Sequence, residues 1–251
     1  MSTIDQLIAS FDPITLERME EVKLLNRVDS KFAFRAGQLP LLLEQMQRDY
    51  FVLEIDGVRL QHYDTLYFDT DDHRLYLNHH NKRANRFKVR SRRYSESGVA
   101  YFEIKFKTNK GRTNKIRNKQ KGLREEIAGK QADLLREGTG MEPDSLRPAL
   151  QIFFSRITLA NRALTERVTI DTGLTFRNGS GEHAFPGVVI AELKQDRSAA
   201  SPLSELLHGH HIRPCRVSKY CIGLASVNPA IRQNNFKRKL LNLKKLNHDV
   251  C

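Results

Sequence analysis

Tryptophan is absent from the 251 residues, and cysteine is scarce. Cys215, Cys221 and Cys251 form no CxxC pair, which excludes the usual spacing of a thiolate zinc site or a disulfide framework. No apolar run reaches the roughly 18 residues of a membrane-spanning helix, and no apolar segment follows a basic N-terminus. The sequence therefore predicts a cytoplasmic protein with reduced thiols, neither secreted nor membrane-spanning.

Acidic residues are also in short supply. Lys and Arg number 42 against 29 Asp and Glu, which gives a formal net charge of +13. This excess predicts a negatively charged partner, but it does not choose among nucleic acid, anionic lipid and a phosphate-rich small molecule. The length fits one large domain or two small ones and allows a substantial core.

Charge recurs at every second position in several segments. Residues two apart in a strand point to the same side, and the intervening positions, such as Phe102, Ile104 and Leu193, are apolar. Each strand therefore has one apolar face and one cationic face with isolated carboxylates. The charged series comprises Lys88, Arg90, Arg92, Glu103, Lys105, Lys115, Arg117, Glu192 and Lys194.

Helical and extended patterns divide the chain into an α+β arrangement, in which helices pack outside an antiparallel β structure. The first predicted helix is kinked at Asp12-Pro13, and Ser218 is placed to cap a later one. Helices are predicted over 3–27, 37–48, 130–137, 145–150, 201–208, 219–228 and 236–246. Strands are predicted over 29–34, within 58–119, and over 152–160, 165–171 and 186–194.

Two arrangements suit these strands: a two-sided sheet with a solvated polar face, or a barrel whose polar face points inward. The barrel explains why there are enough amphipathic helices to cover the apolar faces. It also explains why acids stand singly among bases, unlike the even mixture of a solvated surface. Crowded cations repel one another, so the inward face would need an anion to offset that repulsion.

Seven short segments occur in the order seen in VTC domains. These are the polyphosphate polymerase domains of the triphosphate tunnel metalloenzyme superfamily, and the chain resembles them over about 17–228. A single domain is expected over 1–251, with a basic C-terminal helix within 229–251. The segments are Asp29-Ser30-Lys31-Phe32, Thr65-Leu66-Tyr67-Phe68-Asp69, Val89-Arg90-Ser91-Arg92-Arg93-Tyr94, Phe102-Glu103-Ile104-Lys105, Arg167-Val168-Thr169-Ile170-Asp171, Ala191-Glu192-Leu193-Lys194 and Ser218-Lys219-Tyr220.

The resemblance implies an antiparallel β-barrel tunnel that binds ATP and a growing polyphosphate chain, with Mn²⁺ or Mg²⁺ as cofactor. It implies Glu192 as the metal ligand, with Glu103 as a second candidate. The alternating pattern adds Lys88 and Arg117 to the phosphate-binding set, although Lys88 also suits a solvated strand position. The cations expected to act on the reacting phosphates are Arg90, Arg92, Lys105, Arg167 and Lys219. The other expected phosphate-binding residues are Lys31, Lys115, Lys194 and Ser218.

Arginine offers paired donors to phosphate oxygens, and lysine a compact mobile charge. Phosphoryl transfer depends mainly on positioning and charge stabilisation. In the expected reaction, a terminal phosphate oxygen of the chain attacks the γ-phosphorus of ATP, and ADP leaves. Coupling to export would need a separate membrane protein, because eukaryotic relatives carry a membrane module that this sequence lacks.

Two other functions stay open. One is hydrolysis of inorganic triphosphate or of a nucleotide γ-phosphate within the same fold. Hydrolases of this type carry an N-terminal E-x-E-x-K pattern, whereas this chain has Arg27-x-Asp29-x-Lys31, which favours transfer. The other is nonenzymatic binding of polyphosphate or RNA. The few aromatics on the cationic face, Tyr94 and Tyr101, disfavour RNA because they offer little base stacking.

Some charged residues have plain structural interpretations. Asp171 is expected to orient Arg167 or to end a strand, and Asp69 to form a turn. Glu103 could form an ion pair with Lys105 of little energetic consequence. The basic segment at 236–246 is interpreted as a solvated helix in preference to an anionic-membrane or nucleic-acid contact.

Overall fold

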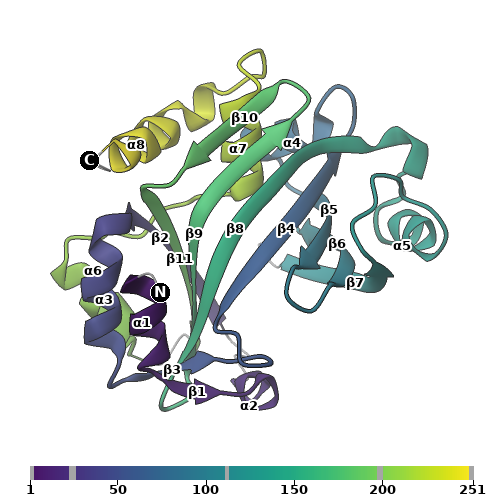
Figure 1. Cartoon of the computed structure of the whole chain (residues 1–251). Coiled ribbons are helices and arrows are strands. Elements are labelled where there is room, and N and C mark those ends of the chain that lie inside the picture. The colour runs from purple at the N-terminus through teal and green to yellow at the C-terminus, as the bar shows by residue number, and fades with distance from the viewer. Residues whose placement is uncertain (1–2, 23–26, 111–112, 197–199, 249–251) are drawn as a thin grey trace.

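A computed structural model of the chain describes residues 3–22, 27–110, 113–196 and 200–248 (Figure 1). Its centre is an eleven-stranded sheet. Most of the strands follow the path β2-β11-β9-β8-β4-β5-β6-β7, and the others, β1, β3 and β10, pair off this path. All neighbours on the path are antiparallel; β1 pairs in parallel with β3. The strands are β1 (Asp12–Ile14), β2 (Arg27–Arg35), β3 (Tyr50–Leu53), β4 (Leu60–Asp69), β5 (Arg86–Tyr94), β6 (Val99–Lys107), β7 (Thr113–Lys121), β8 (Arg147–Asn161), β9 (Glu166–Asn178), β10 (Gly181–Phe185) and β11 (Val188–Asp196).

Helices lie alongside the curved sheet, which confirms the predicted α+β class (Figure 1). Within the described part of the chain, the outermost strands β2 and β7 are not paired with each other, so the hydrogen-bonded ladder is not closed. No helix of the described residues is long and apolar enough to cross a membrane. The helices are α1 (Thr3–Ala9), α2 (Leu16–Glu20), α3 (Leu39–Met46), α4 (Arg74–His80), α5 (Lys130–Thr139), α6 (Pro202–Gly209), α7 (Lys219–Val227) and α8 (Lys237–Asn247).

The predicted apolar faces of the strands are buried against helices. Ala191 and Leu193 of β11 belong to a core cluster with residues of α1, α3 and α6. Phe102 and Ile104 of β6 pack with Leu135 of α5 in another cluster. The charged residues of these strands therefore point to the opposite face of the sheet.

Helix α7 lies on that opposite face. It is buried along most of its length and packs on Ile152, Phe154 and Ile190, which share the face of the charged residues. Gly223 permits the close approach, since a Cβ at this position would lie 2.3 Å from Phe176 and 2.8 Å from Leu150. Ser218 accepts a hydrogen bond from the Cys221 amide (3.4 Å) and caps α7 as predicted.

Two predictions about elements are wrong. The helix predicted over 3–27 is instead α1, β1 and α2, because residues 12–14 pair with 51–53; its end at 23–26 lies outside the described residues. The helix predicted over 145–150 is instead the start of β8, which pairs with β4. Strands β3 and β10 and helix α4 were not predicted. The helices over 37–48, 130–137, 201–208, 219–228 and 236–246 are confirmed within a few residues.

Candidate functional site

A row of three lysines crosses three adjacent strands. Lys88 of β5 lies opposite Lys105 of β6, and Lys105 lies opposite Lys115 of β7. Like charges directly opposite one another destabilise a sheet. Lys88 donates a hydrogen bond to Ser218 Oγ (2.7 Å), and Lys115 forms an ion pair with Glu103. Lys105 has neither kind of partner among the described residues.

The environment of Lys105 is unfavourable for its charge. Arg90 and burial lower the pKa of Lys105 to about 6. Glu192 and Lys194 of β11 also act on this amine, although β6 and β11 are far apart in the strand order. The sheet therefore curves so that the charged sides of β6 and β11 face each other, as the inward-facing interpretation predicts.

Arg90 of β5 lies between Tyr67 of β4 and Glu103 of β6 in the register of the sheet. It lies opposite Glu103 in the register, donates from Nε to Glu103 Oε2 (2.7 Å) and from Nη1 to the hydroxyl of Tyr67 (3.0 Å). The side chain of Glu103 is 1 % exposed. Burial alone would raise the pKa of Glu103, but Arg90 and Arg92 hold it well below its usual range. The predicted pairing of Glu103 with Lys105 is wrong; its partners are Arg90 and Lys115.

A second buried carboxylate organises the other half of the site. Asp171 of β9, 1 % exposed, accepts two hydrogen bonds from Arg156 of β8 (2.6 and 2.8 Å) and forms an ion pair with Lys219. Burial alone would raise the pKa of Asp171, but Arg156 and Lys219 lower it. These partners, Arg156 and Lys219, differ from the predicted partner Arg167, and Asp171 lies inside β9 rather than at a strand end.

Glu192 is the third carboxylate on this face. It forms an ion pair with Lys31 of β2 and lies 3.5 Å from Lys194 Nζ. Burial alone would raise the pKa of Glu192, whereas Lys31 and Lys194 hold it well below its usual range. Beside it in the register lies Thr169, whose buried Oγ1 has no hydrogen-bond partner among the described residues.

The set Glu192 and Thr169 fits a divalent cation that is shared with phosphate. Such a cation often takes one or two protein carboxylates and completes its shell with phosphate and water oxygens. No group of three or more His, Cys, Asp or Glu side chains suited to a metal exists among the described residues. The protein alone therefore offers too few oxygens, and Glu103 is engaged by two cations; its role as a second metal ligand stays a prediction.

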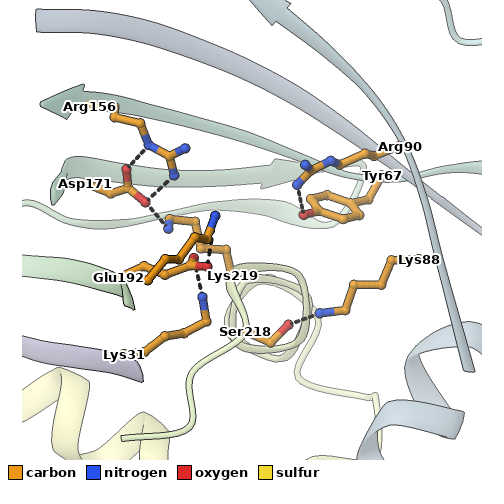
Figure 2. A network of polar contacts seen from close by, with 10 residues as sticks. Lys31, Tyr67, Lys88, Arg90, Arg156, Asp171, Glu192, Ser218 and Lys219 are labelled. Atoms are coloured by element: carbon orange, nitrogen blue, oxygen red, sulfur yellow. Dashed lines mark hydrogen bonds and ion pairs between the residues drawn. The ribbon is translucent and has the colours of Figure 1, made fainter. Parts of the chain in front are cut away.

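Figure 2 shows how these groups converge. Arg156, Asp171, Lys219, Glu192 and Lys31 lie on one side, and Arg90, Tyr67 and Lys88 on the other, with Ser218 between them. The first turn of α7 links both sides, because Ser218 contacts Lys88 while Lys219 contacts Asp171.

The remaining predicted residues border this network. Arg92 donates to Thr65 Oγ1 (3.2 Å) and lies 5.1 Å from the ring centroid of Tyr63. Arg117 is exposed and lies over the ring of Tyr101 (4.7 Å). Arg167 lies opposite Lys194 in the register. The structure thus brings all the predicted site residues onto one face, while their individual roles stay predictions.

The sequence pattern did not indicate three residues of the network. These are Arg156, its hydrogen-bond partner Asp171, and Tyr67. Arg156 and Tyr67 stand among apolar residues that dominate the pattern of their strands.

Asp69 is also more than a turn former. It is buried, ends β4, and accepts hydrogen bonds from the amides of Leu75 (2.7 Å) and Tyr76 (2.8 Å) at the start of α4.

Comparison with known proteins finds similar structures and a matching protein family. The structure is similar to HpAC1 from Hippeastrum, described as a candidate adenylyl cyclase with a dominant triphosphatase activity, at 11 % identity and a TM-score of 0.52; 80 % of this chain and 96 % of that chain are covered. A candidate adenylate cyclase from Bacillus halodurans matches at 14 % identity and a TM-score of 0.47, over 77 % of this chain and 96 % of that chain. No curated protein sequence matches the chain. The family model of the VTC domain matches residues 26–228.

Proposed function

The chain belongs to the VTC domain family, within the triphosphate tunnel metalloenzyme superfamily, and from this premise we propose that it is an ATP-dependent polyphosphate polymerase. Membership supports an enzyme that handles phosphoryl groups with a divalent metal. The transfer of the γ-phosphate of ATP to a polyphosphate chain is the finer proposal.

The observation that carries the proposal is the excess of cations over carboxylates on the charged face. Glu103, Asp171 and Glu192 are each already engaged by two cations. Lys105 has no such partner within the described ranges, and its partial burial reduces its hydration. A chain of phosphates would supply negative charge along the whole row of lysines, which suits a linear polyanion better than a single phosphate.

The residues divide the work of transfer by position. Arg90, Lys88 and Lys105 would hold phosphates on the β5–β6 side, and Lys219, Lys31 and Lys194 on the β9–β11 side. Held between them, the attacking phosphate oxygen and the γ-phosphorus of ATP would be aligned for displacement of ADP. The fixed cations would stabilise charge that develops on the transferred group.

A divalent metal fits beside Glu192 and Thr169, with the remaining oxygens coming from phosphate. When bound there, Mn²⁺ or Mg²⁺ would neutralise phosphate charge and polarise the transferred group. The cations Lys31 and Lys194 keep Glu192 ionised, so the carboxylate is available as a ligand at neutral pH. Transfer is favoured over hydrolysis because the charged face offers few carboxylates to activate water.

Purified protein incubated with ATP and Mn²⁺ tests this function. The proposal expects a ladder of polyphosphate on a polyacrylamide gel, with or without a short polyphosphate primer. Release of free phosphate without chain growth would instead assign the triphosphatase activity. Salt-sensitive polyphosphate binding with no turnover under any metal would assign a binding module.

A further inference from the structure

Tyr67 has a hydroxyl proton with no acceptor. The side chain projects from β4 onto the charged face and is buried, and its oxygen accepts a hydrogen bond from Arg90 Nη1 (3.0 Å). In the described part of the chain, the hydroxyl donates to nothing. A buried donor without an acceptor is costly, so the arrangement calls for an oxygen from outside the protein.

The neighbours of this hydroxyl cannot supply that oxygen. Arg90 contacts it, Lys88 and Arg92 also act on it electrostatically, and none of these side chains has an acceptor. Burial alone would raise the pKa of Tyr67, but these three cations lower it below its usual value. A more acidic hydroxyl is a better hydrogen-bond donor, and its environment of cations attracts an anion as the acceptor.

The ring of Tyr67 is held in place from behind. It stacks on Tyr220 of α7 with 4.8 Å between centroids and 20° between planes. The hydroxyl of Tyr220 points elsewhere and donates to Asp69, which the start of α4 holds through backbone amides. The Tyr67 hydroxyl is therefore pre-positioned beside Arg90, and ligand binding need not order it.

We propose that Tyr67 is a phosphate-binding residue that donates its hydroxyl proton to a non-bridging oxygen of the triphosphate between Arg90 and Lys88. The inference rests on the proposed function for the location of the anion, and it deepens that proposal by adding a neutral donor to the cations. Tyr67 then serves two partners at once, because it accepts from Arg90 and donates to phosphate.

The test uses inorganic triphosphate without metal, so that binding is measured apart from turnover. Calorimetric titration of the Tyr67→Phe variant should show about a tenfold loss of affinity, in the range expected for a lost hydrogen bond to a charged group. The matched control is Tyr220→Phe, which removes the other hydroxyl of the same stacked pair. Its melting temperature should fall, while its affinity for triphosphate stays within about twofold of the wild-type value.

A spectroscopic titration provides a second measurement on the wild-type protein. Ionisation of Tyr67 is followed by phenolate absorbance near 295 nm, and the step that Tyr67→Phe removes is assigned to it. Saturating triphosphate should shift this step to higher pH. The anion accepts a hydrogen bond from the protonated hydroxyl, and its negative charge disfavours the phenolate. An unshifted step would overturn the inference. If the Tyr67→Phe variant failed to fold, the wild-type titration alone would decide, because the inference is overturned when triphosphate moves no phenolate step to higher pH.

The outcomes separate this inference from the proposed function. If the protein makes polyphosphate but Tyr67→Phe binds triphosphate as tightly as wild type, the inference fails alone. If triphosphate binds and Tyr67→Phe weakens it, yet no polyphosphate forms, the inference stands and the polymerase proposal fails. Absence of triphosphate binding by the wild-type protein would overturn both.

Discussion

Lys105 is the residue whose setting is least favourable without a ligand. It lies between two lysines in the register, close to Arg90, and has no ion pair or hydrogen bond of its own among the described residues. Replacing its charge should therefore stabilise the free protein, while a bound polyanion would make the same charge favourable. Stability and binding should respond to this side chain in opposite directions.

The Lys105→Met variant tests this opposition. It should melt about 2–4 °C higher without ligand if it relieves on the order of 1 kcal/mol, and it should bind inorganic triphosphate about tenfold more weakly. Thermal melts with and without triphosphate measure both effects. Lys107→Met is the matched control, since Lys107 is exposed on the same strand; both of its changes should be small.

The pH dependence of the same comparison has a definite sign. Between the folded pKa of about 6 and the ordinary value of 10.5, the unfolded chain holds a proton on Lys105 that the folded protein lacks. Lys105 therefore destabilises the folded protein less as pH rises through this window. The melting advantage of Lys105→Met should be larger at pH 6 than at pH 9, and a constant advantage would contradict the assigned pKa.

Glu192 should matter for metal and not for anion binding. The Glu192→Gln variant should lose the increase in triphosphate affinity that Mn²⁺ confers, because it removes the carboxylate ligand. Affinity without metal should stay equal or rise, since the change also releases Lys31 from its ion pair. Titrations with and without Mn²⁺ measure this, with Glu182→Gln, an exposed carboxylate on β10, as control. A retained Mn²⁺ effect would remove Glu192 from the metal site.

At the scale of elements, α7 determines whether the site is assembled. Its cap Ser218 also accepts from Lys88, and its first residue Lys219 pairs with Asp171. Gly223 sets how closely the helix lies on β8 and β9. The helix thus connects the two halves of the charged face as well as covering the apolar end of the sheet.

A pair of cap variants separates these two roles. Ser201 caps α6 and accepts from the Ser204 amide (3.0 Å), and α6 packs on the apolar face of the sheet, opposite the charged residues. Ser218→Ala and Ser201→Ala should each lower the free energy of unfolding by about 1 kcal/mol, as measured with denaturant. Only Ser218→Ala should also weaken triphosphate binding, because Lys88 loses its partner. Equal affinity of both variants would show that Ser218 is a cap alone.

Elements also explain what sequence patterns could and could not predict. On β5, β6 and β11 the charged and apolar faces keep their sides, so the pattern assigns Arg90, Lys105 and Glu192 to the correct face of the sheet. On β8 the buried apolar positions change sides between Phe154 and Ile157, because α7 covers one end of the strand and α1 and α3 the other. Arg156 therefore follows Phe154 on the same face, where a regular alternation assigns an apolar residue.

On the neighbouring strand β9, the buried apolar positions also change sides, and here the cause is a shift in register. β9 and β8 shift register between Phe153 and Ser155 of β8, near Gly173, which has φ +61°. Val168 and Leu174 of β9 have the same sequence parity, yet they belong to different core clusters. A β-bulge is not visible in a period-two pattern, so the pattern does not reveal that Asp171 lies inside β9 on the charged face.

At the scale of the whole molecule, the charge of +13 is not spread evenly. Much of it lies on the face where the curved sheet brings β5 and β6 toward β9 and β11, and the carboxylates there are already engaged. Another part lies on α8, which packs Leu240 and Leu243 inward and leaves Lys244 and Lys245 exposed. That arrangement agrees with a solvated helix, and α8 lies beyond the part matched by the VTC family.

We propose that the charged face transfers the γ-phosphate of ATP to the end of a phosphate chain. ATP labelled at the γ-phosphorus, supplied with Mn²⁺ and a short polyphosphate primer, tests it most directly when the label is followed from the first turnovers. A polymerase should incorporate the label into chains longer than the primer, with one ADP formed for each phosphate added. Label that appears only as free phosphate, while the primer keeps its length, would contradict it.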